Sequence, residues 1–143
     1  IPLLAMQQTT APDDAVVGSQ SETDETIDVG GADIPARTVW RVSGRDAEMD
    51  AVRFEWSAVA DQSALASATR GHVTVMIADV RKRQGEEAVR DAGGDSVRAE
   101  RSGYALVSLR DGSTLAAEET VLTQLGPFVS RIRMQIRKMP AAN

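Results

Sequence analysis

Period-two alternation of apolar and polar residues constrains the fold of this chain more than any other feature. In the segment AVRFEWSAV, apolar residues occupy every second position from Val52 to Ala58. The segment RTVWRVS places Thr38, Trp40 and Val42 on one side in the same way. Such alternation is typical of a β-strand with one buried face. The sequence therefore predicts that a sheet forms the body of the protein.

The middle of the chain combines helix and strand signals. ADQSALASATRG predicts a short helix, because Asp61 suits an N-cap and Gly71 suits a stop. HVTVMIADV, residues 72–80, is almost continuously apolar and predicts a central strand that is covered on both faces. KRQGEEAVRDAGG contains helix formers and closes with Gly93 and Gly94, so it predicts a second helix.

A hairpin is predicted in GYALVSLRDGSTLAAEE. Asp111 and Gly112 can supply the two positive φ angles of a tight type I′ turn between two extended arms. Glu118 and Glu119 follow, and we expect them in the first turn of another short helix, where negative charge complements the helix dipole.

The C-terminal segment GPFVSRIRMQIRKMP fits two conformations. As a strand, it directs Ile132, Met134 and Ile136 inward. As a helix, it aligns Phe128, Ile132, Ile136 and Met139 at spacings of four, four and three. We favour the strand, because Met134 would lie off the apolar stripe of the helix. The sequence predicts one small α+β domain with a mixed or antiparallel sheet and two or three short helices.

An acidic N-terminal segment precedes this pattern. Residues 1–36 contain seven acidic and no basic residues, whereas residues 37–143 contain 14 acidic and 16 basic residues. The acidic residues are Asp13, Asp14, Glu22, Asp24, Glu25, Asp28 and Asp33. A segment with few large apolar residues and one sign of charge buries too little surface to offset its ordering entropy. We therefore expect residues 1–36 to be a disordered or extended arm, with the globular domain at 37–143.

The opening IPLLAM is too short to span a bilayer, so the sequence predicts no membrane-spanning segment. It is either the remnant of a signal region or anchor, or a short apolar segment that docks on a partner. The chain has no cysteine, which excludes disulfides and thiolate chemistry. We expect an extracytoplasmic or virion location.

Catalytic motifs are scarce. His72 is the single histidine, and no G-x-S-x-G motif accompanies it. The segment VTVMIADVRKRQGEEAVRDAGGDSV resembles the second strand and following helix of short-chain dehydrogenases, which implies Asp79 as a ribose-binding acid. The glycine-rich turn of that family is absent. Its Tyr-x-x-x-Lys motif is absent too, because Ser108 stands four residues after Tyr104. The sequence predicts no cofactor and no metal site.

We expect a non-enzymatic structural or accessory subunit of a virion, secretion or membrane assembly, whose partners are other subunits or copies of itself. The arm and an arginine-bearing sheet face are its predicted contact surfaces. The predicted contact residues are Ile1, Leu3, Leu4, Met6, Arg131, Arg133 and Arg137. Nucleic acid is a weaker candidate partner, because aromatic residues for base stacking make up 3% of the chain. The alternative is a small nucleotide-binding enzyme or ligand-binding domain with Asp79 and His72 near its site.

Overall fold

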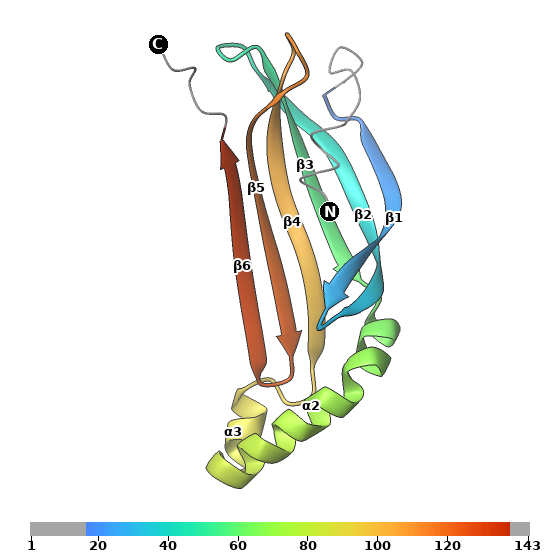
Figure 1. Cartoon of the computed structure of the whole chain (residues 1–143), viewed down its shortest axis with the longest axis vertical. Helices are drawn as coiled ribbons and strands as arrows, with labels where there is room; N and C mark the ends of the chain where they lie inside the picture. Colours follow the sequence, from blue (N-terminus) through green and yellow to red (C-terminus); the bar gives the residue numbers. More distant parts are fainter. Residues whose placement is uncertain (1–16, 138–143) are drawn as a thin grey trace.

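A computed structural model describes residues 17–137, which form one small domain built on a six-stranded antiparallel sheet. The strands follow one another across the sheet in chain order (Figure 1). They are β1 (Gln20–Val29), β2 (Ala32–Asp46), β3 (Ala51–Ala60), β4 (Val97–Ser108), β5 (Thr114–Leu125) and β6 (Phe128–Arg137). Two helices, α2 (Gln62–Gln84) and α3 (Glu86–Asp91), connect β3 to β4. The fold is α+β and dominated by the sheet.

The two faces of the sheet differ sharply in composition. On β3, Trp56, Ala58 and Ala60 are buried, whereas Ser57 and Val59 between them are exposed. Cross-strand partners share a face, so the register extends this division over all six strands. We call the face that carries Trp56 the inner face and the opposite one the outer face. The alternation predicted for β2 and β3 is confirmed.

Helix α2 lies across one end of the sheet (Figure 1). Asp61 caps its N-terminus by accepting a hydrogen bond from the backbone N–H of Ala64 at 2.9 Å. Leu65, Thr69 and Val73 recur every four residues and are buried against the inner face. This apolar stripe holds the helix on the sheet, because residues four apart lie on one side of a helix.

The strand predicted at residues 72–80 is wrong, since these residues continue α2. Val73 lies in the packed stripe, whereas Val75 is 68% exposed. The apolar run therefore contributes one stripe to a helix rather than two faces to a strand. Gly71 does not stop the helix, which ends at Gln84.

The boundary predicted at residue 37 is also wrong. Residues 20–36, assigned from the sequence to the acidic arm, form β1 and the first part of β2. Ile27 and Ile34 are each 2% exposed and belong to the core beneath α2. Gly30 and Gly31 join the strands with positive φ angles of 61° and 91°, as a two-residue hairpin turn requires. The rest of the predicted arm, including Ile1, Leu3, Leu4 and Met6, lies outside the described residues.

The C-terminal half confirms two strand predictions. The predicted hairpin corresponds to β4 and β5, although its turn is longer than the predicted type I′ turn: Gly112 has a φ of 72°, and Asp111 is not in the positive-φ region. Glu118 and Glu119 lie within β5 rather than in a helix. Residues 128–137 form β6, which confirms the strand over the helix.

Candidate functional site

The inner face of β6 carries a row of exposed apolar side chains. β6 pairs with β5 along one side, and residues 17–137 place no strand along its other side. Phe128, Ile132 and Met134 project from its inner face and are 48%, 55% and 38% exposed. An uncovered strand with apolar side chains is a ready template for pairing with another chain. This edge is therefore a candidate binding surface.

The outer face of β6 carries the three arginines predicted as contact residues. Arg131, Arg133 and Arg137 are all exposed. Arg133 forms an ion pair with Glu118 on β5, with 2.9 Å between Nε and Oε1. The hydrogen bond from Arg133, assisted by one from Gln135, lowers the pKa of the Glu118 carboxyl. The structure places the arginines on one stripe, but their role in binding stays a prediction.

A buried polar cluster on the inner face lies between the two halves of the core. Arg101 on β4 donates a hydrogen bond to Glu25 on β1 at 2.7 Å, and its Nε lies 3.8 Å from Glu119 on β5. Trp56 Nε1 donates to Glu119 at 2.8 Å. Thr38 donates to Glu25 at 2.7 Å. The cluster joins β1 to β4 over two intervening strands, so the sheet must curl around its inner face.

Burial shifts the pKa of Glu119 in this cluster. The Glu119 side chain is 1% exposed, and burial raises its pKa, while the hydrogen bond from Trp56 and the charge of Arg101 act in the opposite direction. The Nε of Arg101 is buried without a hydrogen bond. Arg101 and Glu119 are buried, so the cluster acts as a support for the sheet curl rather than as an open site.

This cluster was not predicted from the sequence, although the strand pattern indicates unusual inward-facing charges. Arg101 and Glu119 occupy inward-facing positions of their strands, where the alternation demands apolar residues. A charge at such a position requires a partner. Arg101 and Glu25 are 76 residues apart, so their pairing could not be predicted without the topology of the sheet.

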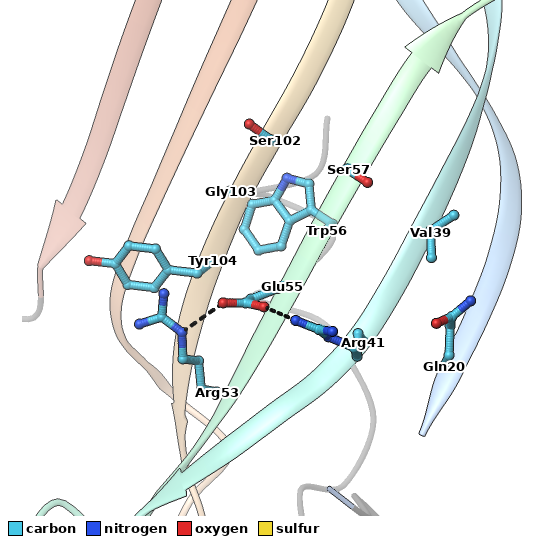
Figure 2. Close-up of a pocket in the computed structure, with 10 residues that line it drawn as sticks. All are labelled: Gln20, Val39, Arg41, Arg53, Glu55, Trp56, Ser57, Ser102, Gly103 and Tyr104. Carbon is cyan, nitrogen blue, oxygen red and sulfur yellow. Dashed lines mark hydrogen bonds and ion pairs between the residues drawn. The ribbon is translucent and has the colours of Figure 1, made fainter. Parts of the chain in front are cut away.

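A polar groove of about 460 Å³ runs over the outer face near the middle of the sheet. Figure 2 shows a row of charges along it, in which Arg41 and Arg53 both bond to Glu55, at 2.8 Å and 3.2 Å. The hydrogen bond from Arg41 is the main cause of the lowered pKa of Glu55. Arg53 also lies over the ring of Tyr104, 4.1 Å from its centroid. Ser57 and Ser102 also line the groove.

The predicted ligand-site residues are separated by the structure. His72 lines a cavity of about 540 Å³ between α2, the β1–β2 turn and the start of β6. Thr69, Phe128 and Ser130 are among its other lining residues. Asp79 does not line this cavity; it forms an ion pair with Arg83 on the exposed surface of α2. The strand that carried the dehydrogenase resemblance is helical, so the structural basis for Asp79 as a ribose-binding residue is removed.

No group of three or more His, Asp or Glu side chains in residues 17–137 could hold a metal ion. Neither helix in this range is long and apolar enough to cross a membrane.

Comparison with known proteins adds no relative. No family model, no curated protein and no solved structure matches the chain.

Proposed function

We propose that this domain is a non-enzymatic structural or accessory subunit that binds another protein chain along β6. The proposal rests on one observation, the row of half-exposed apolar side chains on an open strand edge. Covering the exposed part of Phe128, Ile132 and Met134 would contribute about 1 kcal/mol for each side chain. A strand added to the edge would also gain backbone hydrogen bonds to β6.

The surroundings of this row support a protein partner. Arg131 and Arg137 border it on the outer face and supply a charged rim beside an apolar centre. Acidic residues on the partner would complement this rim, so we propose an acidic strand or segment as the bound element. Membership of a virion, secretion or membrane assembly, and contacts through residues 1–6, stay predictions.

Site-specific crosslinking tests the proposal directly. A photoreactive residue at position 132, on the apolar row, should crosslink a defined partner in the producing cells. The same residue at the exposed position 75 on α2 serves as the control. The crosslinked protein is then purified and should bind the wild-type domain but not an Ile132→Lys variant. Equal crosslinking at both positions, or full binding by Ile132→Lys, contradicts the proposal.

A second candidate function is supported by the cavity beside His72. Its volume of about 540 Å³ lies in the range of small-molecule sites, and it combines hydroxyl groups with apolar walls. We propose a small amphipathic molecule as its occupant. Native mass spectrometry of the purified full chain should then detect a bound small molecule that an Ala68→Trp variant, which fills the cavity, loses. A mass equal to that of the bare chain contradicts this candidate.

A further inference from the structure

The two free edges of the sheet carry opposite charges. Within residues 17–137, β1 and β6 are the outermost strands, on opposite sides of the sheet (Figure 1). The outer face of β1 presents Glu22 and Asp24, whereas the outer face of β6 presents Arg131 and Arg133. Charged side chains on edge strands normally prevent unwanted pairing between sheets. Because β1 is acidic and β6 is basic, these charges oppose pairing of β1 with β1 or of β6 with β6. The same charges favour contact between β1 of one molecule and β6 of another.

The register of the sheet aligns these charges. Followed from strand to strand, one row of cross-strand partners runs through Arg131, Leu122, Glu100, Val59, Arg37 and Asp24. The parallel row two residues along ends at Arg133 on β6 and Glu22 on β1. A second copy placed beside β6 in the same orientation and without stagger therefore sets Asp24 opposite Arg131 and Glu22 opposite Arg133.

Strand direction and one apolar contact agree with this placement, whereas Ile132 and Met134 come opposite Thr23 and Ser21. Neighbouring strands alternate in direction across six strands, so β1 of a second copy in the same orientation runs antiparallel to β6. The same register sets Ile27 of β1 opposite Phe128 of β6 on the inner face. A symmetric β6–β6 pair would instead bring arginines together, and a β1–β1 pair would bring acids together, which opposes both arrangements.

We infer that the partner bound along β6 is the β1 strand of a second copy of this chain. The inference rests on the proposed function, because it names the occupant of the same edge. The contact is head-to-tail, and each copy keeps a free β1 or β6 for the next. Such an interface forms a closed ring if the rotation between copies closes, and otherwise a filament.

Charge reversal at the two edges tests this inference in the full-length protein. Arg131 and Asp24 are the best positions, because neither forms a hydrogen bond or ion pair within residues 17–137. Their row neighbours are less suitable, since Arg133 pairs with Glu118 and Glu22 pairs with Arg37. The controls are Arg70→Glu on α2 and Glu48→Arg in the β2–β3 turn, both exposed and away from the edges.

Sedimentation velocity up to about 1 mM, where weak interfaces associate, measures the outcome. The wild-type chain should self-associate, and Arg131→Glu or Asp24→Arg alone should each weaken association about two- to thirtyfold. An equimolar mixture of the two variants should recover wild-type association, because the two reversed side chains then face each other with opposite charges. The Arg70→Glu and Glu48→Arg controls should associate as the wild type does.

Two results overturn the inference and separate it from the proposed function. A wild-type chain that stays monomeric at about 1 mM excludes the second copy, and crosslinking at position 132 then decides alone whether β6 binds another protein. Association that Arg131→Glu weakens, but that Asp24→Arg leaves intact and the mixture does not restore, keeps β6 as the docking edge and excludes β1 as its occupant.

Discussion

Replacing Arg101 with alanine should destabilise the domain more than any other single change of a charged residue described above. The Arg101 side chain is 9% exposed and bonds to Glu25 at 2.7 Å and to the carbonyl oxygen of Thr26 at 3.3 Å. Its removal takes away the positive charge 3.8 Å from Glu119, which is 1% exposed and keeps the hydrogen bond from Trp56. Breaking a buried ion pair from one side costs about 3–5 kcal/mol, because the other charge stays buried. A typical domain has a total stability of about 5–15 kcal/mol.

Urea denaturation followed by tryptophan fluorescence measures this loss as a shift in the midpoint. Arg98→Ala is the matched control, because Arg98 lies on the same strand but is 54% exposed and pairs with Glu100 on the surface. Its loss should cost less than about 1 kcal/mol. Adding Glu119→Gln to Arg101→Ala should recover part of the stability, since the unpaired carboxylate is then removed. Equal losses for Arg98→Ala and Arg101→Ala would refute the reasoning.

Three further predictions concern stability. Gly103→Ala should cost more than about 2 kcal/mol in urea denaturation, because its Cβ would lie 2.2 Å from a backbone oxygen and 2.7 Å from the Trp56 ring. Gly44→Ala, where a Cβ meets nothing within 4 Å, should change the stability by less than about 0.5 kcal/mol. Asp61→Ala should cost about 1 kcal/mol in thermal denaturation, through the lost helix cap. Burial raises the folded-state pKa of Glu119, so the contribution of Glu119 to stability should fall as pH rises above the ordinary glutamate range. Urea midpoints measured over a pH series should show this fall for the wild type and not for Glu119→Gln. Parallel curves for the two proteins would contradict the assignment.

Alternation of apolar and polar residues predicts strands correctly where the two faces of a strand differ clearly in polarity. AVRFEWSAV and GPFVSRIRMQIRKMP are predicted as strands, and the structure forms a strand in each, over Ala51–Ala60 and Phe128–Arg137. The run at 72–80 was misread, because an unbroken apolar stretch suits a buried strand and a packed helix equally well. The stripe that continues from Leu65 and Thr69 into Val73 was the better guide, because a spacing of four extends through it.

The N-terminal prediction shows how composition can hide a pattern. The charge count in residues 1–36 predicts disorder, although Ile27 and Val29 alternate with the polar residues Thr26 and Asp28 and the pair Gly30 and Gly31 marks a hairpin. Glu22, Asp24, Asp28 and Asp33 occupy the outer face, where charge costs little, while Ile27 and Val29 enter the core. Glu25 faces inward and is paired there with Arg101. Net charge averages over a whole segment, whereas the burial of a strand residue depends on which face of the sheet it occupies.

The candidate site was only partly accessible from the sequence. The arginine stripe of β6 follows from alternation, because it needs one strand alone. Its alignment with the acids of β1 does not, since those two strands meet only through four intervening strands and their registers. The exposure of Ile132 likewise depends on which elements lie nearby, and one strand cannot reveal that.

The order of strands along the sheet has a consequence for how the chain folds. Four of the five strand pairings join segments separated by two to five residues, whereas β3 and β4 are separated by residues 61–96. Closing a short loop costs little entropy, so β1–β3 and β4–β6 can each form early as a three-stranded antiparallel unit. The joining of the two units, guided by the docking of α2, then becomes the slow step. Cleavage after Gly85 would turn that step into a bimolecular reaction, with a rate set by fragment concentration.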